Sequence, residues 1–283
     1  QPVKTGEVSI RCDKPWEQCT GDSPWEARIS GYNSVIFDEQ DQTYKMWYGL
    51  LSARPDGILG AVFAYAQSAD GITWDKPALG LDDGRFGEKT NIVIGAGASG
   101  EEYIHDSHCM VFLDPQADAA ERFKMLARPG ENNPELCIYA SGDGLHWERK
   151  IEKVITYHKE FDQDGKHITA DLDSEGNFIN IRDAHLDSQN IIFWDDRIHK
   201  YVAYVRRNKQ LQSGQYRTIA RGESPDLSSF PLVEEMEEVL EPDVWDSPVV
   251  EQESGREVAG SDMYTNAAIK TDADNAYYMF PSL

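Results

Sequence analysis

Ser34-Val35-Ile36-Phe37-Asp38 is an apolar run that closes on an aspartate, and the same pattern returns twice further along the chain. The later copies are Met110-Val111-Phe112-Leu113-Asp114 and Ile191-Ile192-Phe193-Trp194-Asp195. Their closing aspartates are 76 and 81 residues apart. A repeat at such a period constrains the architecture more strongly than any single motif.

Each copy is followed by three more segments that read as strands. An aromatic-rich run comes first, and the next run ends in the turn signature Ser-x-Asp-Gly-x-x-Trp. Asp-Gly provides the positive φ angles of a tight turn, and a short apolar segment then closes the unit. The second runs are residues 44–48, 123–127 and 201–205, the turns are 68–74, 141–147 and a degenerate 224–230, and the closing segments are 92–94, 154–156 and 239–240.

Four strands per unit at this period predict the blades of an all-β propeller, and an irregular β-sandwich is the alternative. We expect one domain over residues 1–283, with an N-terminal extension at 1–29 and repeats starting near 30, 106, 187 and 262. The last repeat is incomplete, so the chain covers about three and a half blades. Because open strand edges are unfavourable, we expect either about 100 further residues or a closing strand from the stretch up to Ile29.

Composition excludes several classes of partner. Fifty acidic residues against 27 basic ones give a net charge of -23, which repels nucleic acids and anionic membrane surfaces. No apolar run approaches the roughly 20 residues of a membrane span, so we expect no membrane insertion. The start at Gln1 indicates a processed chain, secreted or periplasmic, that has lost its signal peptide. In that setting Cys12 and Cys19 are candidates for a disulfide, whereas Cys109 and Cys137 read as core residues.

The candidate catalytic residues follow from the repeat. First strands of propeller blades line the central channel, so equivalent positions at their starts converge. Eight residues before each closing aspartate stand Ser30, Asp106 and Asp187, and the fourth unit has Asp262 in this place. Neighbouring carboxylates raise one another's pKa, which separates an acid from a base or nucleophile, as glycosidic cleavage requires. The alternative is that each aspartate caps a loop.

Residues able to bind sugar hydroxyls or stack on a sugar ring lie close to these aspartates. A tryptophan beside a carboxylate and an arginine can form a sugar platform, although a tryptophan pinned against the outside of a blade fits equally well. No His or Cys spacing indicates a transition metal, and we expect no cofactor beyond a structural calcium that an acidic pocket could hold. The predicted substrate-binding residues are Trp25, Glu26, Arg28, His105, His108, Gln189, Asn190, Tyr264 and Asn266. Asp38, Asp114 and Asp195 are read as turn formers.

From about Asp13 onward the chain resembles the glycoside hydrolase superfamily of invertases, levansucrases and arabinanases (glycosyl hydrolase families 32 and 43). The resemblance rests on Pro24-Trp25-Glu26-Ala27-Arg28, Phe37-Asp38-Glu39, the Ser-x-Asp-Gly-x-x-Trp turns and Asp187-Ser188-Gln189-Asn190. It implies a five-bladed β-propeller of four-stranded antiparallel blades with three channel acids, which Asp106, Asp187 and Asp262 would match. The chain departs from the family in lacking Asn-Asp-Pro-Asn, in having no Pro after Arg182-Asp183, and in having Ser30 at the first acidic position, for which Glu26 is a substitute.

These observations favour a glycoside hydrolase that acts on a plant or algal polysaccharide or oligosaccharide. Asp187 or Asp262 would be the general acid, and Asp106 the base or nucleophile. One alternative is a propeller that binds carbohydrate without catalysis. Another is a glycoside phosphorylase, which needs a basic phosphate pocket, with Arg206 and Arg207 as the obvious pair. Oligomeric state is not predicted.

Overall fold

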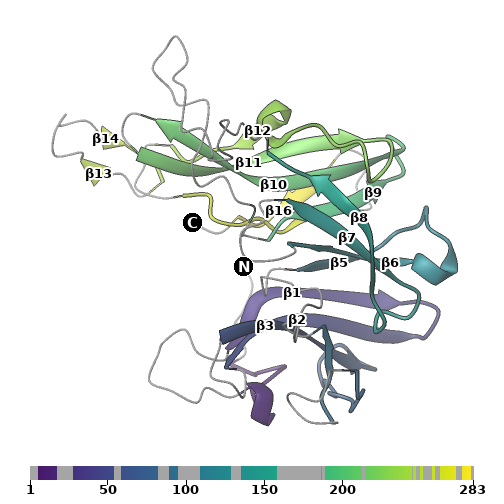
Figure 1. Ribbon diagram of the computed structural model, residues 1–283. Helices are drawn as coiled ribbons and strands as arrows, with labels where there is room; N and C mark the ends of the chain where they lie inside the picture. The colour runs from purple at the N-terminus through teal and green to yellow at the C-terminus, as the bar shows by residue number, and fades with distance from the viewer. Residues whose placement is uncertain are drawn as a thin grey trace, which may run out of the picture. The chain divides into compact units, whose positions relative to one another are not determined.

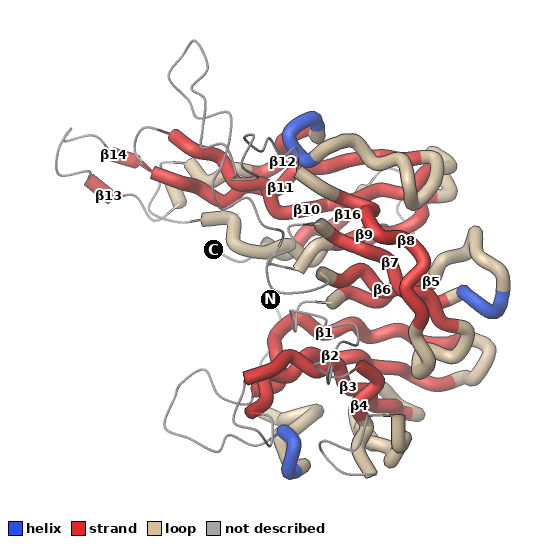
Figure 2. Tube along the Cα trace, in the orientation of Figure 1, coloured by secondary structure: helices blue, strands red, loops and turns tan. Residues whose placement is uncertain are grey.

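The regular structure of the chain is almost entirely β-strand (Figures 1 and 2). The computed structural model describes residues 6–17, 28–53, 59–81, 89–94, 109–128, 135–157, 186, 189–211, 214–243, 245–246, 249–250, 257–258, 262–271 and 276–281. Within these ranges the helices are three short 3₁₀ turns, η1 (Pro15–Glu17), η2 (Ala119–Glu121) and η3 (Val233–Glu235). None of the helices in the described ranges has the length and hydropathy to cross a membrane.

The first sheet has four antiparallel strands in the order β1-β2-β3-β4. Side chains alternate between its faces, and one face carries the buried cluster of Met46, Tyr48, Leu50, Val62, Ala64, Ala66 and Ile92. Trp16 and Trp74 pack against this cluster from the segments that flank the sheet. The strands are β1 (Arg28–Asp38), β2 (Thr43–Ala53), β3 (Leu59–Ser68) and β4 (Ile92–Ile94).

The second sheet repeats this order as β5-β6-β7-β8. Its two central strands are buried at every position, as expected for strands covered on both faces. The fully buried Cys109 and Cys137 lie just before β5 and in β7, which confirms that they are core residues. The strands are β5 (Met110–Leu113), β6 (Phe123–Ala127), β7 (Leu136–Ser141) and β8 (Glu148–Ile155).

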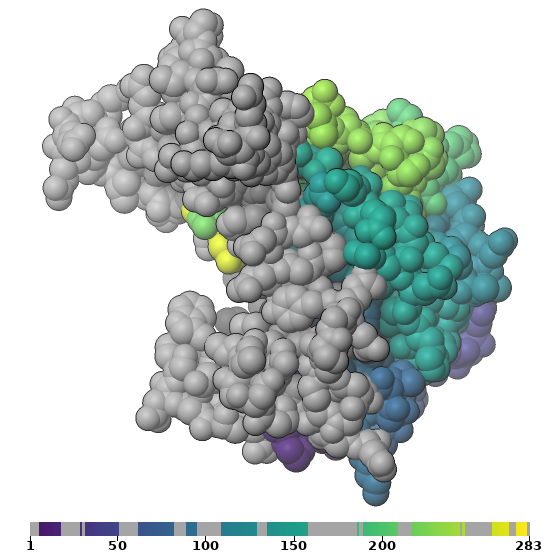
Figure 3. Space-filling view, viewed as in Figure 1, coloured from purple at the N-terminus to yellow at the C-terminus, as the bar shows by residue number. Residues whose placement is uncertain are grey.

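The third sheet has the order β9-β10-β11-β12. The segment that follows β8 contacts the segment of η3: the Val233 N–H donates to the Thr156 carbonyl at 3.1 Å. The two segments lie side by side in teal and light green in Figure 3. The strands are β9 (Ile191–Asp195), β10 (Lys200–Leu211), β11 (Gly214–Ser224) and β12 (Glu237–Leu240).

Two strand pairs follow the third sheet. β13 (Val249–Val250) pairs with β14 (Glu257–Val258), and β15 (Ala268–Lys270) pairs with β16 (Tyr277–Met279). By its internal contacts the chain divides into two compact units, residues 1–131 with 139–149 and residues 132–138 with 150–283, so the boundary falls within β7 and β8.

The three sheets confirm the predicted unit of four antiparallel strands and the all-β class. The second strand of unit two matches its predicted bounds, whereas β2 and β10 extend well beyond theirs. In the fourth unit the strand begins only at Ala268, because the residues before it bond to β11 instead: the Met263 N–H donates to the Arg217 carbonyl at 3.0 Å. The division into one domain and the closure of a five-bladed ring stay predictions.

The Ser-x-Asp-Gly signature forms the same turn each time. In the first copy the Ser68 hydroxyl oxygen accepts from the Gly71 N–H at 2.9 Å, and Asp70 accepts from the N–H groups of Ile72 and Thr73. These backbone donors lower the pKa of Asp70 to about 2. Gly71 and Gly144 both have positive φ, which confirms the reason for glycine there.

Candidate functional site

The strand-closing aspartates are turn formers, as predicted. The Oδ1 atom of each accepts a hydrogen bond from the backbone N–H two residues later, which is the geometry of an Asx turn. The pairs are Asp38 with Gln40 at 3.1 Å, Asp114 with Gln116 at 3.0 Å and Asp195 with Arg197 at 2.9 Å. These residues therefore shape the hairpins between first and second strands.

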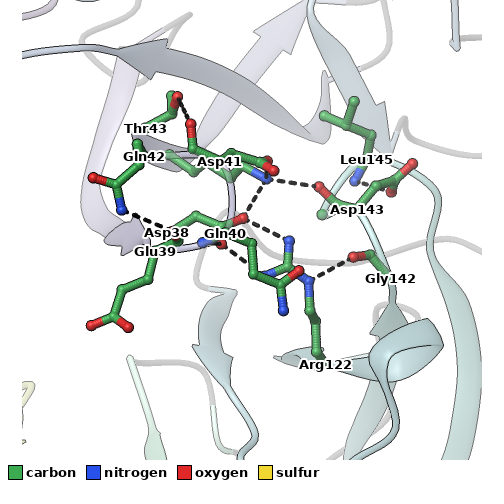
Figure 4. Close-up of polar contacts among 12 residues, drawn as sticks. Asp38, Glu39, Gln40, Asp41, Gln42, Thr43, Arg122, Gly142, Asp143 and Leu145 are labelled. Atoms are coloured by element: carbon green, nitrogen blue, oxygen red, sulfur yellow. Dashed lines mark hydrogen bonds and ion pairs between the residues drawn. The ribbon is translucent and has the colours of Figure 1, made fainter.

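Asp38 also connects the first sheet to the second through side-chain contacts, within the first of the two compact units. The Arg122 guanidinium donates to both of its carboxylate oxygens at 2.8 and 2.6 Å (Figure 4). Lys45 Nζ lies 2.7 Å from Oδ2. The carboxylate is 1% exposed. The Arg122 hydrogen bonds, followed by Lys45, outweigh burial and hold the pKa of Asp38 well below its usual range. This group is a buried structural anchor.

Asp262 is the predicted catalytic residue that lies in the described part of the chain. Its Oδ1 accepts from the Arg217 backbone N–H at 3.0 Å, and its Oδ2 forms an ion pair with the Arg217 guanidinium at 2.5 Å. The Asp262 side chain is 29% exposed. Its donor stands 45 residues earlier in β11, so the carboxylate is not a cap of its own loop. It is a partly exposed acid held in one orientation by a charge-assisted pair.

Tyr264 lies beside this ion pair. The guanidinium of Arg206 is 4.7 Å from the centre of its ring and that of Arg217 is 5.3 Å away, both within cation–π range. Arg206 is buried and also donates to the Tyr264 carbonyl at 3.2 Å. Burial, with the neighbouring Arg217 charge, lowers the pKa of Arg206. Tyr264 remains 38% exposed, so a sugar face or hydroxyl can reach it.

Two of the predicted substrate-binding residues, Asn190 and Asn266, have buried side-chain amides. Asn190 donates to the Leu186 carbonyl at 3.2 Å and accepts from the Arg206 N–H at 2.9 Å, which fixes the start of β9 against β10. Asn266 is 1% exposed, and its Oδ1 has no hydrogen-bond partner among the residues described. A buried acceptor of this kind is normally paired with a donor. Gln189 is half-buried.

The remaining predicted residues cannot be placed. Asp106, Asp187, Trp25, Glu26, His105 and His108 lie outside the described residues, and Arg28 is described only as the first backbone position of β1. Their roles stay predictions. Cys19 is likewise outside the description, and Cys12 is exposed.

The chain has two Pro-Trp-Glu segments, at residues 15–17 and 24–26, and the first of them packs against the blade as a structural element. Its Trp16 indole N–H donates to Asn91 at 2.9 Å, and Trp16 packs on the first sheet's core. Glu17 is fully buried, accepts from the Tyr48 hydroxyl at 2.7 Å and pairs with Lys76 at 2.6 Å. This segment is therefore pinned beside the outer strand β4.

Arg217 is the residue that sequence reasoning missed. The register of β10 and β11 places it opposite Asn208, and alternation along β10 puts Arg206 on that same face. Arg207 points to the other face and donates to the Met236 carbonyl at 3.2 Å. The predicted Arg206–Arg207 pair is thus replaced by Arg206 with Arg217. No local sequence pattern identifies Arg217, because its position beside Arg206 depends on the pairing of β10 with β11.

No group of three or more His, Cys, Asp or Glu side chains that could hold a metal occurs in the described ranges. The acidic pocket proposed for calcium includes Asp106 and Asp187, so that prediction is untested.

Comparison with known proteins finds similarity to solved structures at low sequence identity. No protein-family model and no curated protein matches the sequence. Among solved structures, it is similar to an N-acetylgalactosamine deacetylase from F. plautii in complex with blood group B trisaccharide (14% identity, 94% of this chain and 66% of that one, TM-score 0.48). It is also similar to the Bombyx mori GH32 β-fructofuranosidase BmSUC1 (13%, 92% and 43%, TM-score 0.48). A third is an exo-1,5-α-L-arabinanase from a bovine ruminal metagenomic library (9%, 91% and 70%, TM-score 0.44). The chain thus spans less than two thirds of the length of the first two structures.

Proposed function

We propose that this protein is a glycoside hydrolase that cleaves a polysaccharide or an oligosaccharide derived from it, with Asp262 as one of its reacting carboxylates. The observation that carries the proposal is the Asp262 side chain, which is partly exposed and oriented from β11 rather than used to cap its own loop. Hydrolysis breaks the bond between the anomeric carbon and the glycosidic oxygen. Water supplies the new oxygen on that carbon, and a carboxylic acid supplies the proton to the leaving oxygen.

The surroundings of Asp262 support a carbohydrate substrate. Tyr264 offers a partly exposed ring, and Asn266 offers a buried acceptor without a protein partner in the described part of the chain. Such groups suit a ligand with one apolar face and several hydroxyls. Asp106 and Asp187 occupy the equivalent positions of the second and third repeats and are the candidates for the second carboxylate.

The test compares Asp262→Asn with wild type on a panel of neutral plant and algal polysaccharides, with release of reducing sugar as the measurement. The change keeps the size of the side chain and removes its acid–base chemistry. We expect turnover to fall by about 10² to 10⁴-fold. Asp118→Asn is the matched control, because Asp118 is exposed and its side chain makes no cap hydrogen bond at η2.

Equal turnover in wild type and Asp262→Asn would remove Asp262 from the mechanism. A wild-type protein that is retarded in polysaccharide gels but releases no sugar would instead support the non-catalytic binding alternative. Cleavage that depends on inorganic phosphate would support a phosphorylase.

A further inference from the structure

Trp245 is the most exposed of the large apolar side chains in the described ranges, at 87%. Tryptophan is usually buried for most of its surface, and Trp47 is fully buried in this chain. Trp245 stands between the end of β12 at Leu240 and the candidate residue Asp262. Its exposure therefore calls for a ligand or a partner.

The turn that presents Trp245 is held by its own polar groups. The Trp245 N–H donates to Asp243 Oδ1 at 2.7 Å, and the Asp243 N–H donates to Asp246 Oδ2 at 2.9 Å. The Asp246 N–H closes the turn on the Asp243 carbonyl at 3.0 Å. None of these bonds uses the indole. The ring is thus displayed by a fixed backbone and is not required to build it.

We propose that Trp245 is a stacking platform for one neutral sugar ring of the substrate, flanked by the carboxylates of Asp243 and Asp246 as hydroxyl acceptors. The proposal rests on the carbohydrate substrate of the proposed function and adds a second binding position to it. An indole covers the apolar face of a pyranose or furanose, and each carboxylate oxygen has two lone pairs for hydroxyl hydrogens.

The described residues next to Trp245 in the sequence favour a sugar over a protein partner. Protein interfaces need a contiguous apolar centre of several side chains. The other described residues from Glu241 to Asp246 are three acids and a proline, with no second large apolar side chain. A sugar needs a single ring.

The acidic residues close to Trp245 in the sequence indicate which class of sugar polymer would bind to it. Glu241, Asp243 and Asp246 lie within four residues of it in the sequence, and the whole chain carries a net charge of -23. Uronate and sulfate polymers are repelled by such a surface. The platform is therefore specific for neutral polysaccharides.

Affinity electrophoresis of the full chain through gels that contain arabinan, galactan, fructan or β-glucan tests this platform. We expect retardation of wild type in at least one gel and about a tenfold loss of affinity in Trp245→Ala, with most of it restored in Trp245→Phe. Phe280→Ala is the matched control, because Phe280 is an aromatic side chain 63% exposed elsewhere in the chain. Polygalacturonate gels should retard none of these proteins.

Equal retardation of wild type and Trp245→Ala overturns the platform, as does the absence of retardation in every neutral gel. The outcome is separable from that of the proposed function. Cleavage with unchanged affinity in Trp245→Ala overturns the platform alone, whereas retardation that depends on Trp245 without any sugar release overturns hydrolysis alone.

Discussion

At the scale of single residues, two aspartates differ in burial and in the number of cationic partners among the described residues. Asp38 is enclosed and bound by Arg122 and Lys45, whereas Asp262 has one arginine partner and keeps part of its surface in solvent. A buried carboxylate without its partners would be strongly unfavourable. The two aspartates, which stand at different positions of different repeats, therefore have different environments.

Asp38→Asn is predicted to lower the free energy of unfolding by about 3 to 5 kcal/mol, because it leaves the Arg122 and Lys45 charges without their buried partner. Chemical denaturation measured at neutral pH checks this value. Asp118→Asn, at an exposed position, should stay within about 0.5 kcal/mol of wild type. A loss for Asp38→Asn as small as that of the control would contradict the role of Asp38 as an anchor.

The contribution of Asp38 should depend on pH in a defined direction. Its pKa in the folded chain lies below the ordinary value of 3.8, so the stabilisation is fully present above about pH 4. As the pH falls below 3.8 the unfolded state binds the proton first, and the stabilisation is lost progressively. The difference in stability between wild type and Asp38→Asn should therefore shrink from pH 5 to pH 3. A difference that grows over this range would show the opposite sign.

At the scale of elements, the turn signature explains why the hairpins share one geometry. Serine and aspartate bind the backbone of the turn, and the glycine takes a φ of 72° at Gly71 and 81° at Gly144. The copies differ in what surrounds them. The Trp47 indole N–H donates to the Gly144 carbonyl at 2.7 Å, which fixes Trp47 against the second turn.

Gly144→Ala should therefore be more damaging than Gly71→Ala. Both changes place a methyl group on a backbone with positive φ, at about 1 to 2 kcal/mol. At Gly144 the new Cβ would also lie 2.5 Å from the Trp47 ring, whereas at Gly71 it meets Tyr44 at an ordinary 3.5 Å. For Gly144→Ala we expect an additional loss of about 1 to 3 kcal/mol in the free energy of unfolding. Thermal or denaturant unfolding of the two variants, compared with wild type, gives the difference, and equal losses would refute it.

At the scale of the whole molecule, the net charge of -23 decides which ligands can approach. Phosphate backbones and polyuronates are repelled, and neutral glycans are not. The same charge acts on the folded chain itself, because like charges are closer together in the compact state than in the unfolded one.

Moderate salt is accordingly predicted to raise the melting temperature. Between about 10 and 300 mM NaCl the Debye length falls to well under 10 Å and screens this repulsion, while buried pairs such as Asp38 with Arg122 are screened much less. Scanning calorimetry at fixed pH measures the effect, and KCl should match NaCl. A melting temperature that falls with salt would mean that attractive surface pairs outweigh the repulsion.

The sequence by itself determined the unit of four strands, the turns and the class of fold, because these depend on local periodicity and on residues such as Asp-Gly whose conformational preferences act within a few positions. It also made Asp262 a candidate by its phase in the repeat, and that role stays a prediction. Only the tertiary structure decided that Asp262 pairs with Arg217, that Arg206 and Arg207 point to opposite faces, and that Trp16 is fixed while Trp245 is displayed. Those outcomes depend on strand register and on partners tens of residues away in the sequence. Local sequence patterns do not show which of these distant residues come into contact.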